Sequence, residues 1–339
     1  MEDNKKKVNI ELIKRIIIFL LLIVIVAVFR DELVDGIHEM RRVSFIQVAG
    51  IFALALMYML IEGYIIYQMS KAYNPEISYS GCVGCAYYCE FLRLVTFGSG
   101  AGIGEIYYLS KKGIKPANAT GLSLIQYMLR KIAIGVLGGL CFILCFDTVN
   151  PYIGEYKIYL LFAVILTSII GICIIFLSCS GKCAELIFRI LDLAGRKWSI
   201  SGKLEKLKNQ VVILQSGAKD LFKSRTRLIK VMCLNFCKFF CLYMIPYVLY
   251  GSDTKLSMGM SFVLMSLATM IAGVIPTPSG YGSIDFCLLI LFEAIIGDAR
   301  VVSLALLYRI VTTVTPAVIG GVVAWKGSLN RSEMNSLKD

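Results

Sequence analysis

The sequence is poor in charged residues and has a single histidine. Charged side chains make up 17% of the 339 residues, against about 25% in soluble domains. His38 lies in a charged loop, away from the cysteines, so the sequence indicates neither a metal site nor histidine-based catalysis. The GxxxxGK[ST] motif of ATP-binding loops is absent, and the alternating glycines of 98–104 do not match a dinucleotide-binding fingerprint. We therefore expect no cofactor, no metal ion and no catalytic residue.

Apolar residues dominate the remainder, with 58% hydrophobic residues and a mean hydropathy of +0.75. The charges are confined to short runs between long apolar stretches, and about 20 apolar residues suffice to span a bilayer. The sequence therefore predicts an all-α polytopic membrane protein, with a single transmembrane domain over residues 1–339. The net charge of +12 lies in loops, where basic residues set orientation and contact anionic lipid headgroups. Nucleic acid is not expected as a partner.

Six apolar stretches are long enough to be full spans. They cover residues 12–29, 43–69, 119–146, 158–178, 229–250 and 301–325. Basic residues around the first stretch place the N-terminus in the cytoplasm by the positive-inside rule. The basic region 179–227 is predicted to be a cytoplasmic connector. Within it, leucines at helical spacing between lysines predict an amphipathic helix, lying either on the headgroups or against the protein.

Two further apolar segments are interrupted. Residues 81–118 contain GSGAGIGE at 98–105, and residues 257–297 contain IPTPSGYGSID at 275–285. If each segment crossed the membrane once, the basic connector or the basic C-terminal tail would lie outside. The positive-inside rule therefore favours two re-entrant hairpins that enter from opposite sides, in addition to about six full spans, with both termini cytoplasmic.

The two halves repeat the same order of features. The predicted repeats cover residues 43–146 and 229–325. In the first, Glu105 follows the break and Arg130 comes 25 residues later; in the second, Asp285 follows the break and Arg309 comes 24 residues later. With opposite orientations this is an inverted repeat, and broken helices at corresponding positions of two halves are typical of a transport site.

The glycines of the first break have two interpretations. An interrupted helix frees backbone groups that must line a cavity or contact protein, and glycine permits such turns. The pairs Gly98/Gly102 and Gly100/Gly104 also have the spacing that allows helices to pack closely.

Several charged residues are expected at bilayer depth, where charges are rare and usually functional. They are Glu62, Glu90, Arg93, Glu105, Arg130, Lys131, Lys238, Asp285, Glu293 and Arg309. Glu90 and Arg93 are expected to pair on one helix face. Arg130 and Arg309 are candidate phosphate ligands, because a guanidinium binds phosphate bidentately and stays charged when desolvated. The acids would bind an amine or a coupling cation, or would pair with the arginines.

Two motifs resemble a known family. GEIYYLSKKGIKPANAT at 104–120, followed by Arg130, and IPTPSGYGSID, followed by LLYRIVTTVTPAVIGG at 306–321, are similar to the transmembrane domain of the lysylphosphatidylglycerol synthetase/flippase family, the multiple peptide resistance factor. The resemblance covers about residues 10–326. It implies a flippase of the bacterial cytoplasmic (inner) membrane that moves aminoacylated phosphatidylglycerol to the outer leaflet, which contributes to resistance against cationic antimicrobial peptides. The candidate substrate-binding residues are Glu105, Arg130, Asp285, Arg309, Tyr308, Gly102, Gly104, Pro276, Pro278, Gly280 and Gly282.

The sequence also departs from the family pattern. The family's best-known members continue into a cytoplasmic aminoacyl-transferase domain, whereas this chain ends soon after Trp325. We therefore expect a transporter without enzymatic activity, with a separate aminoacyl-lipid synthase and a second copy of the chain as candidate partners. Asp285 stands where glutamate is expected and Ser279 where glycine is usual, which leaves the substrate open. The alternatives are a flippase for another lipid, an ion-coupled transporter of a small solute, and a non-transporting membrane scaffold.

Overall fold

The computed structural model of the chain is helical throughout the part that it describes. The described residues are 30–96, 98, 100–145, 150–151, 158, 161–162, 165–166, 169, 212, 224–273 and 282–336. No strand occurs in these ranges, which agrees with the predicted all-α class. Four helical segments are long and apolar enough to cross a membrane: Phe45–Ser70, Pro116–Leu144, Arg225–Tyr250 and Asp298–Lys326. They correspond to four of the six predicted spans; the stretch 12–29 and most of 158–178 lie outside the described residues.

Each half places two short helices between two long segments. The first half contains α3 (Phe45–Ser70), α4 (Tyr79–Val95), α5 (Ala101–Lys111) and α6 (Pro116–Leu144), preceded by α2 (Arg30–Arg42). The second contains α11 (Arg225–Tyr243), α12 (Ile245–Tyr250), α13 (Met258–Ala272), α14 (Ser283–Ile296), α15 (Asp298–Arg309), the π-helix η3 (Ile310–Val314) and α16 (Thr315–Ser336). The short helices α4, α5, α13 and α14 have 17, 11, 15 and 14 residues, fewer than the roughly 20 that a span needs. Their depth in a membrane stays a prediction.

Serine side chains start corresponding helices in both halves. The Ser44 hydroxyl accepts the Gln47 N–H at 3.3 Å, and the Gln47 side chain accepts the Ser44 N–H at 2.9 Å, forming a capping box at the start of α3. Ser78, Ser224 and Ser257 cap α4, α11 and α13 in the same way through their hydroxyls. Because Ser224 supplies this cap, α11 begins earlier than the predicted span at 229–250.

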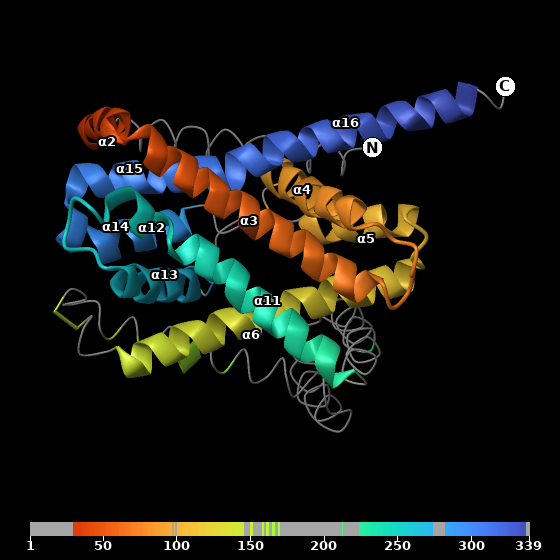
Figure 1. Cartoon of the computed structure of the whole chain (residues 1–339), viewed down its shortest axis with the longest axis horizontal. Helices are drawn as coiled ribbons and strands as arrows, with labels where there is room; N and C mark the ends of the chain where they lie inside the picture. Colours follow the sequence, from red (N-terminus) through yellow and green to blue (C-terminus); the bar gives the residue numbers. More distant parts are fainter. Residues whose placement is uncertain are drawn as a thin grey trace, which may run out of the picture.

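The two halves pack on each other reciprocally. The long helices α3 and α11 lie side by side, with the α4–α5 pair and the α13–α14 pair on opposite sides of them (Figure 1). The last helix of the first half, α6, packs on α13, and the last helix of the second half, α16, packs on α4. The same succession of contacts thus occurs twice, as two related halves would produce. Which half faces which side of a membrane stays a prediction.

The first short-helix pair is an antiparallel hairpin. Asn74, before α4, donates through Nδ2 to the carbonyl of Lys112, after α5, at 2.8 Å, so the outer ends of the two helices meet. At the closed end Gly98 has a φ of 94°, which residues with a side chain rarely adopt. Its N–H donates to the carbonyl of Arg93 at 2.8 Å. The sequence break therefore corresponds to a glycine-closed turn.

The second break lies mostly outside the described residues, which resume at Gly282 after a gap at 274–281. The predictions for Pro276, Pro278 and Gly280 fall in this gap. Gly282 has a φ of 84° and donates its N–H to the Asp285 carboxylate at 3.1 Å, so the acid caps the start of α14.

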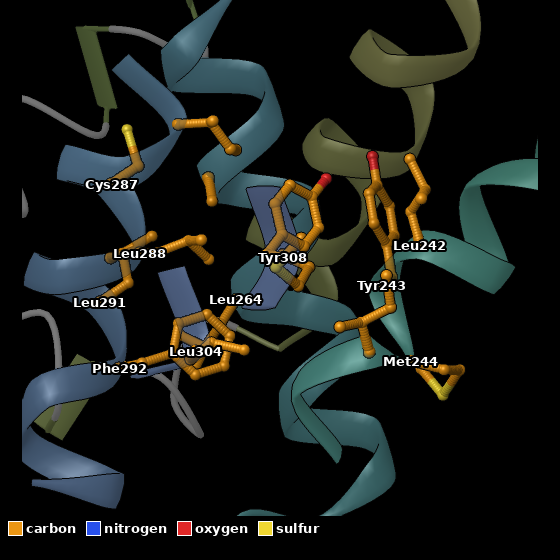
Figure 2. Close-up of a cluster of buried hydrophobic side chains, with 14 of the residues drawn as sticks. Leu242, Tyr243, Met244, Leu264, Cys287, Leu288, Leu291, Phe292, Leu304 and Tyr308 are labelled. Carbon is orange, nitrogen blue, oxygen red and sulfur yellow. The ribbon is translucent and has the colours of Figure 1, made fainter. Parts of the chain in front are cut away.

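An apolar core joins α11, α13, α14 and α15, and Figure 2 shows part of it. Leu264, Leu288, Phe292 and Leu304 are fully buried in this core. Tyr308 belongs to the same core and is also buried. The Tyr243 hydroxyl lies 2.6 Å from that of Thr269, which holds α11 against α13. This packing fixes the backbone on which Tyr308 and its neighbour Arg309 are placed.

Candidate functional site

A cavity of about 660 Å³ lies between the two halves. Helices α3 to α6 form one wall, and α11, α13, α14, α15 and η3 contribute to the other. Charged side chains of both signs line it: Glu62, Glu90, Arg93, Glu105, Arg130, Lys131 and Arg309. Because charges among membrane helices are costly, this concentration marks the cavity as the candidate site.

Glu62 of α3 is the centre of a buried ionic cluster. Its Oε1 accepts hydrogen bonds from Gln126 at 2.8 Å and from the Arg130 guanidinium, both on α6. Its Oε2 accepts a hydrogen bond from the Lys238 ammonium on α11 at 2.5 Å. Lys238 is fully buried and Glu62 is 5% exposed, so each depends on the other for charge compensation. The single carboxylate of Glu62 is paired with two bases, Arg130 and Lys238, so this cluster has a net positive charge.

Arg130 keeps one N–H donor that no described residue uses. Its Nε is buried and has no hydrogen-bond partner among the described residues, while the side chain as a whole is 21% exposed and lines the cavity. The sequence left open whether this arginine binds a ligand or pairs with an acid. It pairs with an acid, Glu62 rather than Glu105, and still faces the cavity.

Arg309 and Asp285 form a two-pronged ion pair in the second half. The Arg309 Nε donates to Oδ1 of Asp285 at 2.7 Å, and its Nη2 donates to Oδ2 at 2.6 Å. The two side chains are 21% and 27% exposed. Pairing between acid and arginine, one of the two predicted alternatives, therefore occurs here. Arg309 lines the cavity, whereas Asp285 is not among the described lining residues; its oxygens accept hydrogen bonds from Arg309 and from the Gly282 N–H.

A π-helical turn directly follows Arg309, and Pro316 explains it. In a regular α-helix the Pro316 ring would clash with the carbonyl of residue 312, and proline has no N–H to donate. The extra residue of η3 changes the register, so that the Thr315 N–H reaches the carbonyl of Ile310. The Thr312 hydroxyl donates to the Tyr308 carbonyl at 2.6 Å. Such turns are frequent at functional sites, and this one places Thr312 on the cavity wall.

Glu105 of α5 lines the first-half wall of the cavity and is 8% exposed. The Ser123 hydroxyl of α6 donates to its Oε2 at 2.7 Å. Its Oε1 is buried and has no hydrogen-bond partner among the described residues. In contrast to Glu62 and Asp285, Glu105 forms no ion pair with a base in that part of the chain.

The two predicted glycines of α5 have different surroundings. A Cβ on Gly104 would overlap the end of the Leu92 side chain of α4, so this glycine leaves room for that side chain where α5 packs on α4. A Cβ on Gly102 would meet only the Ser123 hydroxyl, at 3.7 Å, and Gly102 is exposed on the cavity wall. The packing interpretation therefore applies to Gly104, whereas the turn is made by Gly98, and Gly102 lines the cavity from within α5.

Glu62 and Lys238 were expected among the charged residues at bilayer depth but not among the substrate-binding residues. They lie 176 positions apart, and nothing in the sequence indicates that they meet. Gln126 was missed altogether, since a single amide in an apolar helix is a weak signal. The predicted pair of Glu90 and Arg93 is confirmed, with an N–O distance of 2.8 Å.

Comparison with known proteins agrees with the motifs. The family model described as "Lysylphosphatidylglycerol synthase TM region" matches residues 12–320 of the chain. A search of curated proteins gives no match. The matched region contains the cavity residues of both halves, so the whole candidate site lies within it.

Proposed function

Because the chain belongs to the family of lysylphosphatidylglycerol synthase transmembrane regions, we propose that it is a phospholipid flippase for aminoacylated phosphatidylglycerol. Family membership makes it a multi-pass membrane protein with a lipid-related role. The proposal adds that a lipid such as lysylphosphatidylglycerol moves from the inner to the outer leaflet of a bacterial cytoplasmic membrane. A less negative outer surface would then repel cationic antimicrobial peptides.

The observation that carries this proposal is the cavity with charges of both signs. An aminoacylated phosphatidylglycerol headgroup has a phosphodiester anion and at least one ammonium group. Arg130, Lys131 and Arg309 provide cationic donors for the phosphate, and Glu105 provides an acid for the ammonium. The volume of about 660 Å³ falls within the range of roughly 300–1,000 Å³ that is usual for small-molecule sites. A charged headgroup would cross the bilayer at lower cost along these groups than through hydrocarbon.

The arrangement of the halves supports alternating access to this cavity. We propose that the two hairpins are the oppositely oriented re-entrant elements of an inverted repeat, and that the cavity between them opens to each leaflet in turn. The aminoacylated lipid would be supplied by a separate synthase.

The test is transport in proteoliposomes that contain lysylphosphatidylglycerol labelled on an acyl chain, so that the headgroup is unmodified. Dithionite quenches label in the outer leaflet, and its time course reports movement between leaflets. We expect faster movement with protein than without it; equal rates would reject the proposal.

Two arginine variants test the site. Arg130→Lys and Arg309→Lys keep the charge but lose the bidentate fork, so both are expected to slow transport. Arg300→Lys is the matched control, because Arg300 pairs with Glu39 away from the cavity and its side chain is 36% exposed. Unchanged rates in both cavity variants would remove these arginines from the site.

A second candidate function is an ion-coupled transporter of a small solute. It is favoured by the Glu105 carboxylate oxygen that has no hydrogen-bond partner among the described residues, since such an oxygen is suited to a coupling cation. Sodium- or proton-dependent uptake of a water-soluble compound, without lipid movement, would support this candidate over the flippase.

A further inference from the structure

We propose that Glu105 alone is the ammonium-binding residue of the cavity, and that Asp285, its counterpart in the second repeat, is not. This assignment rests on the proposed flippase function. In the sequence the two acids are equivalent, since each follows a glycine-rich break and precedes an arginine by 25 or 24 residues. Their surroundings in the folded chain separate them.

Both carboxylate oxygens of Asp285 already accept hydrogen bonds, so this residue is not suited to bind a ligand cation. Arg309 holds both of its oxygens, at 2.7 and 2.6 Å, and the Gly282 N–H adds a third hydrogen bond at 3.1 Å. This carboxylate is compensated within the protein and does not line the cavity. It is a positioning residue, because it orients the Arg309 fork.

Glu105 has the opposite character. Among the described residues its one hydrogen-bond donor is a neutral hydroxyl, that of Ser123, and its second oxygen is buried without a partner. A carboxylate accepts about four hydrogen bonds when ionised, and burying one without a counter-charge is costly. A ligand that brings a positive charge and N–H donors supplies both missing components.

The neighbouring charges favour an ammonium at Glu105 and a phosphate elsewhere. On α3, Glu62 is already compensated by Lys238 and Arg130, so it does not compete for the ligand cation. On α4, Glu90 is paired with Arg93. Arg130, on α6 with Ser123, retains an unpartnered Nε. Among the described residues, the cavity thus has a carboxylate on α5 without a basic partner and an arginine N–H on α6 without an acceptor. This pair of groups matches a headgroup that carries both signs.

The cavity is open close to Glu105. Gly102 lies one helical turn before Glu105, it is exposed on the cavity wall, and a Cβ there would touch only the Ser123 hydroxyl. The absent side chain keeps this side of α5 open, and a primary ammonium would approach the Glu105 carboxylate from here. A larger side chain at this position should block that approach.

The experiment compares three acyl-labelled lipids in proteoliposomes: alanylphosphatidylglycerol, its N-acetylated form, and phosphatidylglycerol. Acetylation removes the positive charge and keeps the ester. We expect the wild type to move the alanyl lipid about tenfold faster than the N-acetyl lipid, a factor that corresponds to about 1.4 kcal/mol. Glu105→Gln should abolish this preference, and Gly102→Leu should reduce it.

Two controls locate the effect. Glu293→Gln removes an acid from an exposed position on α14 outside the cavity and should keep the tenfold preference. Asp285→Asn should slow all three lipids alike and leave the preference intact, since it loosens Arg309 without touching the ammonium site.

Three results would overturn the assignment. They are a wild type that moves the alanyl and N-acetyl lipids equally, a Glu105→Gln variant that keeps the preference, and a Glu105→Gln variant that instead loses a dependence on sodium or on a proton gradient. The first of these results is measured on the wild type, so the proposal can be refuted even if Glu105→Gln fails to fold. If the wild type moves none of the lipids, the flippase proposal itself fails, which is a separate outcome.

Discussion

The Glu62 cluster allows a quantitative test of how the two halves are held together. Glu62→Gln leaves two bases, Lys238 and Arg130, without their shared counter-ion, and Lys238 is fully buried. Removing one partner of a buried ion pair costs about 3–5 kcal/mol, so we expect the free energy of unfolding to fall by about that amount.

Lys238→Met is a milder change. It removes the 2.5 Å hydrogen bond to Glu62, but Arg130 and Gln126 still compensate the carboxylate. A hydrogen bond to a charged group contributes about 1.5–3 kcal/mol, which sets the expected loss. The double variant Glu62→Gln/Lys238→Met leaves a single uncompensated base. It should therefore be less destabilised than the sum of the two single variants, by about 0.5–3 kcal/mol.

The assay is reversible unfolding of the purified protein in mixed micelles with increasing sodium dodecyl sulfate, followed by circular dichroism. Glu293→Gln serves as the reference, because an exposed substitution should stay within about 0.5 kcal/mol of the wild type. The role of Glu62 as a shared counter-ion is refuted if Glu62→Gln also stays within that limit, or if the two single effects add fully in the double variant.

Three further predictions follow from the local geometry. Gly320→Ala should lower the midpoint of thermal unfolding, because its Cβ would overlap the backbone carbonyl of Tyr87 on α4, whereas Gly102→Ala should leave the midpoint unchanged; equal midpoints would contradict the close packing of α16 on α4. Asp285→Arg should destabilise the protein, and adding Arg309→Asp should recover the stability of the pair but not lipid transport; no recovery would indicate that the ion pair is not what holds these side chains. Pro316→Ala should permit a regular α-helix and so slow transport by turning Arg309; wild-type transport would show that the π-turn is dispensable.

Local features of this protein could be read from its sequence. The four long helical segments and the ion pair of Glu90 with Arg93 depend on residues within a few positions of one another. The first break was predicted as well, since Gly98 adopts a backbone conformation that few other residues tolerate. Membrane residence and the family followed from the apolar pattern and the motifs.

The tertiary structure decided which charges meet. The acid–arginine spacing is nearly the same in both halves, yet Arg309 pairs with Asp285, whereas Arg130 pairs with Glu62. One oxygen of Glu105 is therefore left without a hydrogen-bond partner among the described residues. Helices that are apolar on all sides contain no polar stripe that indicates which face turns inward. In lipid, no contact with water selects one face over another. Partners on different helices are set by close packing between the halves. That is why the sequence identified the charged residues but could not assign the partners that lie on different helices.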